Sequence, residues 1–404
     1  MQVASRPSAA APRLSGRPAA AASPSAAPGR ARRCVARRSA ADGPGGAPPP
    51  AASPFGAPPP QRQPQPRDAA SPQQQGRPRP WSLHSWSWRG HRVNYATAGC
   101  GRPVVLVHGF GASLGHYRAT IPALAAAGYK VYALDLLGFG ASDKPVLQEG
   151  YSIELWAQLL ADFAREFPLA DGGGGGGSPA GSGAVFVGNS VGSLVCLAAA
   201  AELPADAVAG VCLLNSAGAM NNKGVVADWR IIAALPLLWL IDLLLSIRPI
   251  ARALFDNVRD RATLAKVLRG VYRNEAAVDD DLVDIIAGPS NDETALDVFV
   301  SVITGPAGPK PWDLLPRIAA PIFIAWGDRD PFTPLDGPVG KFFADLPEGR
   351  AGTRFALLPD VGHCPQDDRP ELLHAELLPW LAALPAGGPA CGVAAAAAGG
   401  AADG

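Results

Sequence analysis

The stretch Val185-Phe186-Val187-Gly188-Asn189-Ser190-Val191-Gly192-Ser193 decides which fold this sequence predicts. It opens as a short apolar strand, passes through the pattern Gly-x-Ser-x-Gly, and continues with helical spacing over residues 194–203. A serine at so sharp a turn adopts a strained backbone, and the small residues Gly188 and Gly192 let strand and helix approach each other closely. The pattern is typical of a nucleophile elbow, which exposes the Ser190 hydroxyl above a parallel sheet.

The elbow pattern has a plain alternative, an ordinary loop of glycine and serine. The chain carries 46 glycines, so Gly-x-Ser-x-Gly also arises by chance. The choice therefore depends on whether the rest of the chain supplies the other parts of a catalytic site in the right order.

The composition excludes several classes of function. The chain has 404 residues, 48% of them hydrophobic, which is ample for a core, and its formal net charge of +0 gives no electrostatic case for a nucleic-acid partner. The six cysteines have neither CxxC nor paired spacing, which argues against a disulfide framework and against a zinc site. We therefore expect no metal and no other cofactor.

The order of the predicted elements indicates an α/β architecture. An antiparallel hairpin with its turn at Arg89-Gly90 opens the fold, and strands then alternate with helices, as in a mostly parallel sheet with helices on both faces. The predicted strands span 104–107, 130–134, the elbow strand from 185, 208–214, 321–326 and 353–358, and the predicted helices span 116–127, 153–167, 194–203, 339–346 and 370–384.

Changes of composition set the predicted boundaries. Residues 1–80 are rich in Ala, Pro, Ser, Gln and Arg and almost free of acids, which favours a disordered leader acting as an organelle transit peptide over a mere low-complexity tail. The core is expected in two parts, residues 81–217 with a glycine-rich surface loop at 171–183, and residues 319–385. A helical cap at 218–318 separates them, and a disordered tail at 386–404 follows.

The cap contains a very apolar run at residues 231–247. It is too short for a membrane span and contains Pro236 and Asp242. Two readings stay open: a buried cap helix, or a surface that dips into a membrane or covers a lipid-like ligand. An inserted cap at this point in the chain lies over the carboxyl ends of the strands, where the serine points.

Histidine and aspartate residues complete a catalytic set after the serine. A serine hydroxyl needs a base to take its proton, and the expected chain order is Ser, acid, His. His363 lies in a glycine-flanked loop after the last strand and is the predicted base, whereas His374 falls inside the final helix and is read as a surface residue. Asp330 is the predicted acid, with Asp328 as its close competitor; the alternative acid position, after the preceding strand, holds Asn215.

The oxyanion of an ester-cleaving reaction needs backbone N–H donors. Val191, directly after the serine, supplies one, and Phe110 in the His108-Gly109-Phe110-Gly111 loop is expected to supply the other. His108 is read as a structural residue that fixes this loop. With these parts in order, the chain is predicted to be a serine hydrolase of the α/β-hydrolase fold, with an inserted helical cap.

Longer strings resemble a known family. The string Leu134-Asp135-Leu136-Leu137-Gly138-Phe139-Gly140 resembles the plastid α/β-hydrolases that include pheophytinase, whereas haloalkane dehalogenases and epoxide hydrolases are similar in pattern but have an aspartate nucleophile. The strings Leu214-Asn215-Ser216-Ala217-Gly218-Ala219-Met220-Asn221-Asn222-Lys223 and Gly362-His363-Cys364-Pro365-Gln366-Asp367-Asp368-Arg369-Pro370 are similar to the chlorophyll dephytylases. The likeness covers roughly residues 91–384, apart from the glycine tract.

The resemblance implies hydrolysis of the phytyl ester of chlorophyll to chlorophyllide and phytol, in the chloroplast and in peripheral contact with thylakoid membranes. It implies Ser190 as nucleophile, His363 as base and Asp330 as its partner. Three alternatives stay open: a plastid pheophytinase, a broad-specificity carboxylesterase or lipase, and a non-catalytic protein of this fold that binds a small ligand.

Overall fold

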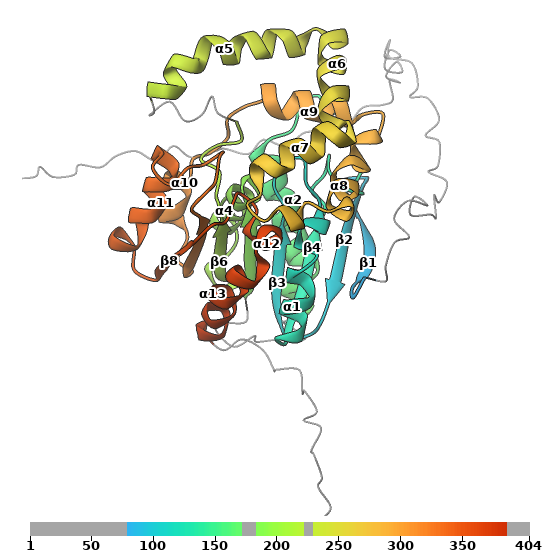
Figure 1. Ribbon diagram of the computed structural model, residues 1–404. Helices are drawn as coiled ribbons and strands as arrows, with labels where there is room; N and C mark the ends of the chain where they lie inside the picture. Colours follow the sequence, from blue (N-terminus) through green and yellow to red (C-terminus); the bar gives the residue numbers. More distant parts are fainter. Residues whose placement is uncertain (1–78, 172–182, 222–228, 386–404) are drawn as a thin grey trace, which may run out of the picture. The chain divides into compact units, whose positions relative to one another are not determined.

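Eight strands form one sheet in the part of the chain that the structure describes (Figure 1). The structure is a computed structural model that describes residues 79–171, 183–221 and 229–385, all within one unit that spans residues 69–404. The predicted leader, the predicted tail and nearly all of the glycine-rich loop lie outside the described residues.

The sheet opens with the expected hairpin, formed by β1 (Ser82–Trp88) and β2 (His91–Ala98). Its turn residues Arg89 and Gly90 both have positive φ, 50° and 83°. Two-residue hairpin turns of this kind match the twist of the flanking strands, and glycine adopts the required conformation without strain. The hairpin is confirmed.

The sheet order is β1-β2-β4-β3-β5-β6-β7-β8; β2 is antiparallel to β4, and the strands from β3 to β8 are parallel to one another. The carboxyl ends of the parallel strands therefore meet at one edge of the sheet. The parallel strands are β3 (Arg102–Val107), β4 (Tyr129–Leu134), β5 (Ala184–Asn189), β6 (Val208–Leu214), β7 (Ile322–Gly327) and β8 (Thr353–Leu358).

Helices cover both faces of the sheet, because both faces of the inner strands are apolar. Val104 and Leu106 of β3 pack in the cluster with α1 (Thr120–Ala126) and α13 (Pro370–Ala383). Val105 and Val107 point the other way, into the cluster with α2 (Ile153–Glu166), α4 (Val191–Glu202) and α11 (Pro338–Gly349). Short helices in the core are η2 (Leu114–Tyr117), α3 (Pro168–Asp171), η3 (Ala205–Ala207) and α12 (Pro365–Asp368).

One predicted helix is wrong in extent. The single helix expected over residues 116–127 is divided into η2 and α1. Pro122 explains the division, because a proline ring inside a helix collides with the carbonyl group four residues earlier, here that of Arg118. Pro122 is tolerated only in the first turn of α1, so the helix cannot continue back through Arg118.

The segment between β6 and β7 is helical, and Figure 1 shows α5, α6, α7 and α9 beyond the end of the sheet. Aspartates begin two of these helices: Asp260 accepts backbone hydrogen bonds at the start of α7, and Asp279 at the start of α8. The elements are α5 (Trp229–Ser246), α6 (Arg248–Arg259), α7 (Arg261–Val271), η5 (Glu275–Ala277), α8 (Asp280–Ala287), η6 (Pro289–Asn291), α9 (Ala295–Thr304), α10 (Pro311–Leu314) and η7 (Leu315–Arg317).

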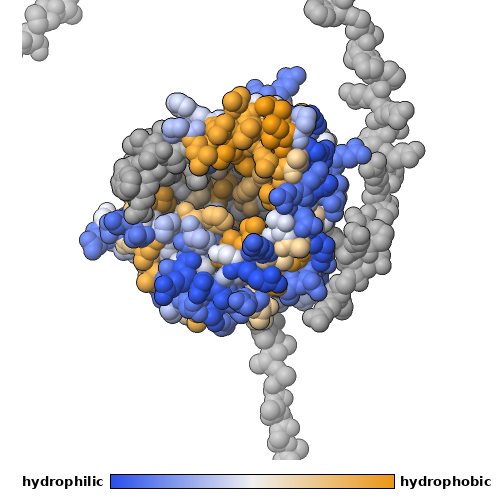
Figure 2. All heavy atoms as spheres, turned by 45° about the horizontal axis from the view of Figure 1, so that its top comes forward, coloured by the Kyte–Doolittle hydropathy of each residue, from blue (hydrophilic) through white to orange (hydrophobic). Residues whose placement is uncertain are grey.

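Helix α5 exposes an apolar face. Leu245 is buried against the rest of the cap, but Trp239 and Leu243 are 66% and 60% exposed. Figure 2 shows hydrophobic residues gathered on the cap side of the molecule, next to a hollow in the surface. Helix α5 is thus not a buried cap helix, and none of the described helices is long and apolar enough to span a bilayer.

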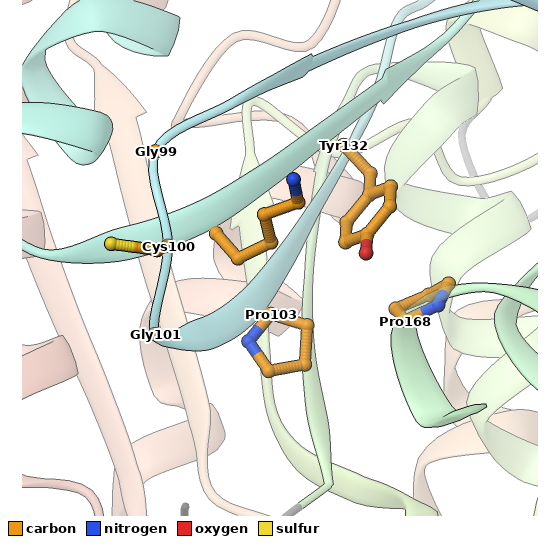
Figure 3. A pocket seen from close by; sticks show the side chains of 7 residues that line it. Gly99, Cys100, Gly101, Pro103, Tyr132 and Pro168 are labelled. Carbon is orange, nitrogen blue, oxygen red and sulfur yellow. The ribbon is translucent and has the colours of Figure 1, made fainter. Parts of the chain in front are cut away.

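A cavity of about 200 Å³ lies at the amino ends of the strands, around the loop between β2 and β3 (Figure 3). Because the serine stands at the carboxyl ends, this cavity is not the candidate active site. Cys100, which lines it, is disulfide-bonded, a pairing that the cysteine spacing did not reveal. The cavity is lined by Gly99, Cys100, Gly101, Pro103, Lys130, Tyr132 and Pro168.

Candidate active site

Ser190 stands in the strained turn between β5 and α4. Its φ and ψ are 55° and −122°, a combination that side-chain-bearing residues rarely adopt. A side chain at Gly188 would collide with the backbone of Gly192, and one at Gly192 would collide with the carbonyl oxygen of Val107. The two glycines therefore allow the close approach that the elbow requires.

The residues beside Ser190 fix it to the neighbouring strands. The Ser190 N–H donates to the carbonyl oxygen of Leu214, at 2.9 Å. The Asn189 side-chain amide donates to the carbonyl oxygens of Leu214 (3.1 Å) and His363 (3.0 Å). The elbow and the histidine loop, 174 residues apart in the chain, are thus held together through Asn189.

His363 and Asp330 form a buried pair. The His363 Nδ1 lies 2.8 Å from the Asp330 Oδ2, and the Asp330 side chain is fully buried. Burial by itself would raise the pKa of Asp330, but hydrogen bonding and attraction from His363, together with hydrogen bonds from Thr333 and Asn215, lower it to about 2. Asp330 is therefore charged at neutral pH and can orient His363 and stabilise its imidazolium form.

Asn215 and Thr333 support Asp330, and the sequence reading missed both roles. The Asn215 amide donates to the Asp330 Oδ2 at 2.8 Å while its own oxygen accepts from the Gly327 N–H at 3.0 Å. The Thr333 hydroxyl donates to the same carboxylate oxygen at 2.6 Å. The only available signal was the place of Asn215 directly after a strand, and that signal did not indicate that Asn215 contacts Asp330.

The two competing residues have other roles. Asp328 accepts a hydrogen bond from the Val361 N–H at 3.3 Å and so helps to form the turn. His374 is not a surface residue: it is half-buried, and its Nε2 lies 3.1 Å from the Thr120 hydroxyl. The reason is that α13 packs its His374 side against α1, which helical periodicity alone did not reveal.

The expected oxyanion donors lie on either side of the serine. Val191 is the first residue of α4, and the N–H groups of a first helical turn have no partner within the helix. Phe110 lies in the turn after β3, where Gly111 has a φ of 69°. A side chain at Gly109 would lie 3.1 Å from the Ser190 Cβ, so this turn is packed directly against the serine.

His108 fixes the turn that carries Phe110. It is fully buried, its Nδ1 lies 2.8 Å from the Gly109 carbonyl oxygen, and its Nε2 accepts from the Leu136 N–H at 3.0 Å. Burial lowers the pKa of His108, which keeps the ring neutral and able to accept this hydrogen bond. Its geometry is that of a structural residue and not of a base.

The groups described above are side chains and backbone N–H groups. Among residues 79–171, 183–221 and 229–385, no group of three or more His, Cys, Asp or Glu side chains is arranged to hold a metal ion. A serine in a strained turn and a His–Asp pair, with the Gly109 turn packed against the serine, can together support nucleophilic attack on an ester or similar carbonyl.

This sheet order, with a serine between β5 and α4 and the His–Asp pair after β8 and β7, defines the class of the α/β hydrolases. The model of the "Alpha/beta hydrolase family" matches residues 104–376, more than half of the sequence. The chain belongs to the α/β hydrolase family, and it is a hydrolase of that family.

The similarity to individual proteins is low. The chain is similar to bifunctional epoxide hydrolase 2 of Sus scrofa, 33% identical over 36% of this chain and 24% of that protein. It is 25% identical to the chloroplastic pheophytinase of Arabidopsis thaliana, over 74% of this chain and 65% of that protein. The crystal structure of CarC, a serine hydrolase involved in carbazole degradation, shares the fold with a TM-score of 0.56 and 22% identity, over 75% of this chain and 99% of that one.

The chain thus spans about a quarter of the length of the first of these relatives and just under two thirds of the second. The fold is shared with the CarC structure, and membership of the family rests on the match over residues 104–376. The reaction and the substrate are not transferred by such distant similarity.

Proposed function

We propose that this protein is a serine hydrolase that cleaves the phytyl ester of chlorophyll, releasing phytol and chlorophyllide. The observation that carries the proposal is the charged, buried Asp330 at 2.8 Å from His363, beside a serine in a nucleophile elbow. We assign the nucleophile to Ser190, the base to His363 and its partner to Asp330.

The proposed reaction has two halves. The Ser190 oxygen attacks the ester carbonyl while His363 takes the serine proton, and the N–H groups of Val191 and Phe110 stabilise the oxyanion. His363 then gives its proton to the departing phytol oxygen, which leaves the pigment acid esterified to Ser190. Water attacks this acyl-enzyme with His363 again as base, and chlorophyllide leaves as the serine is restored.

The nucleophile favours ester cleavage over other reactions of the family. Epoxide hydrolases and haloalkane dehalogenases, which the sequence resembles in pattern, have an aspartate nucleophile, and this chain has Ser190 at the elbow. A serine with a histidine base suits acyl transfer, because the histidine that activates the serine can also activate the water that hydrolyses the serine ester.

Aromatic side chains support an apolar substrate. Phe110, in the oxyanion turn, is 40% exposed, and its ring centre lies 5.9 Å from that of Phe299 in α9. Phe299 in turn lies 5.3 Å from Phe255 in α6. Binding of a long isoprenoid chain is stabilised by about 25 cal/mol for each Å² of apolar surface that it removes from water. The similarity to pheophytinase, a distant one, supports a phytyl ester in particular.

The exposed face of α5 supports contact with a membrane. Trp239, Leu240 and Leu243 lie on one side of this helix and are exposed to solvent. An apolar face of this kind enters the interface of a bilayer without spanning it. We therefore propose peripheral contact with thylakoid membranes and a location in the chloroplast, where the pigment substrate is held.

The test is hydrolysis of two pigments by the full chain. The protein is incubated in detergent with chlorophyll a and, separately, with pheophytin a, and phytol release is followed beside the Ser190→Ala variant. The variant keeps the fold, because only a hydroxyl is removed, and it is expected to release no phytol. Release from chlorophyll that depends on Ser190 is the expected result.

Other results point to the alternatives. Release from pheophytin alone favours a pheophytinase, which the similarity to that protein makes the second candidate. Cleavage of simple esters without either pigment favours a carboxylesterase or lipase. Labelling of Ser190 by a fluorophosphonate without turnover of any ester favours a ligand-binding protein, and hydrolysis that survives Ser190→Ala contradicts the proposed site.

A further inference from the structure

One buried carboxylate joins the loop of His363 to the helical cap. Asp368 in α12 is fully buried, and its Oδ2 accepts a hydrogen bond of 2.6 Å from the N–H of Gly362. The same carboxylate accepts hydrogen bonds from the N–H groups of Arg273 (3.1 Å) and Asn274 (2.8 Å), in the cap segment that follows α7. The two segments therefore share one acceptor group.

Backbone contacts place the same two segments against each other. The N–H of His363 donates to the carbonyl oxygen of Val271, the last residue of α7, at 3.2 Å. A side chain at Gly362 would collide with that carbonyl oxygen. The end of α7 therefore lies directly on the backbone of the histidine loop, with no room for a side chain between them.

The neighbouring carboxylate strengthens the joint. Asp367 accepts from the Tyr272 hydroxyl at 3.0 Å and from the Arg118 guanidinium at 2.7 Å. Arg118 also binds Asp279, at the start of cap helix α8, at 2.7 Å. Burial raises the pKa of Asp367, and the attraction and hydrogen bonds of Arg118 oppose that rise.

We propose that Asp368 is a positioning residue for His363, and that it couples the orientation of the base to the docking of the cap. The inference rests on the proposed role of His363 but not on the identity of the substrate. The donors that reach the Asp368 side chain from Gly362, Arg273 and Asn274 are backbone N–H groups, so both of its oxygens are needed as acceptors.

The Asp368→Asn variant tests this directly. The amide has the size of the carboxylate, but in either orientation its NH2 group faces a backbone N–H, which pushes the cap segment and the histidine loop apart. We expect kcat for a p-nitrophenyl ester to fall about 10- to 100-fold with little change in KM, the scale of a small misplacement of a catalytic group. Labelling of Ser190 by a fluorophosphonate should slow by the same factor.

Asp360→Asn is the matched control. Asp360 also links the two segments, through an ion pair with Arg273 at 3.4 Å, but it is an exposed residue. Its φ of 54° is one that asparagine tolerates. Because exposed ion pairs contribute little, kcat of this variant should stay within about twofold of the wild-type value.

The outcomes are separated by measuring the melting temperature and the pH profile of kcat with each variant. The proposal is overturned if the Asp368→Asn variant has a lower melting temperature but, when assayed well below that temperature, keeps the kcat and the pH profile of the wild type. If Asp368→Asn does not fold, Tyr272→Phe, which removes one cap hydroxyl from the joint, replaces it: a lowered kcat supports the coupling, and an unchanged kcat overturns it. Failure of the wild-type protein to be labelled at Ser190 counts instead against the proposed function.

Discussion

Asp330→Asn is the substitution for which the structure gives the sharpest expectation. Both oxygens of this carboxylate act as hydrogen-bond acceptors. The Oδ1 accepts from the N–H groups of Phe332 (2.8 Å) and Thr333 (3.1 Å). The Oδ2 accepts from the Thr333 hydroxyl, the Asn215 amide and His363. An asparagine must turn its NH2 group toward one of these sets. The Oδ1 side faces fixed backbone donors, so the NH2 group should turn toward His363.

That orientation reverses the histidine tautomer. The His363 Nδ1 would accept a hydrogen bond from the new amide, which leaves the proton on Nε2, the nitrogen that must take the proton of Ser190. The ring would keep its position but could not act as a base. By analogy with the wrong-tautomer effect in serine proteases, kcat should fall by about 10⁴.

The cost to stability should be much smaller than the loss of activity. The pKa of Asp330 is lowered to about 2 from an ordinary value of 3.8, and its side chain is fully buried, so no discount for solvent screening applies. At 1.36 kcal/mol for each unit of pKa, the interactions that favour the charged form amount to about 2 kcal/mol, which is the expected loss in free energy of unfolding at neutral pH.

The assay compares ester hydrolysis and urea unfolding of the wild-type and Asp330→Asn proteins at neutral pH. Asp328→Asn is the control, because Asp328 follows the same strand but contacts the Val361 N–H and the Arg329 guanidinium. Hydrolysis by Asp330→Asn within tenfold of the wild type, or an equal loss in Asp328→Asn, would refute the assignment of Asp330 as the partner of His363.

Two further predictions concern pH and the membrane. Burial, reinforced by electrostatic repulsion from neighbours that include Arg118, lowers the pKa of His116 to about 3. Between pH 6.5 and 3 the unfolded chain therefore binds a proton that the native protein excludes, so the free energy of unfolding should fall on acidification by up to about 1.4 kcal/mol per pH unit for this group alone. Urea unfolding as a function of pH measures this, and a His116→Gln variant with an equally steep dependence would contradict it. Leu243→Asp, in the exposed face of α5, should weaken sedimentation with galactolipid vesicles without changing hydrolysis of a soluble ester. Leu83→Asp, at another exposed leucine on β1, should bind as the wild type does.

Local patterns in the sequence were sufficient for the elements of the core. The strands at 208–214 and 353–358 were predicted with the bounds that the structure has, because apolar runs between turn residues carry that information locally. The elbow at Ser190 was predicted for the same reason, since its glycines and its serine are adjacent in the chain. The limits of the helix at 116–127 failed because Pro122 outweighed the helical spacing.

What surrounds the candidate catalytic residues was decided only by the tertiary structure. Asn215 reaches Asp330 across 115 residues of chain, and Asp368 receives Asn274 across 94. No local pattern encodes such contacts, because they arise when the sheet order brings the ends of β6, β7 and β8 together and the cap folds onto them. The same holds for the burial of His374 and the exposure of Leu243, since a helical pattern marks an apolar face without specifying what covers it. The sequence by itself determined the turn that carries Ser190 and the order of the strands along the chain, and tertiary packing determined which groups hold His363 and Asp330 in place.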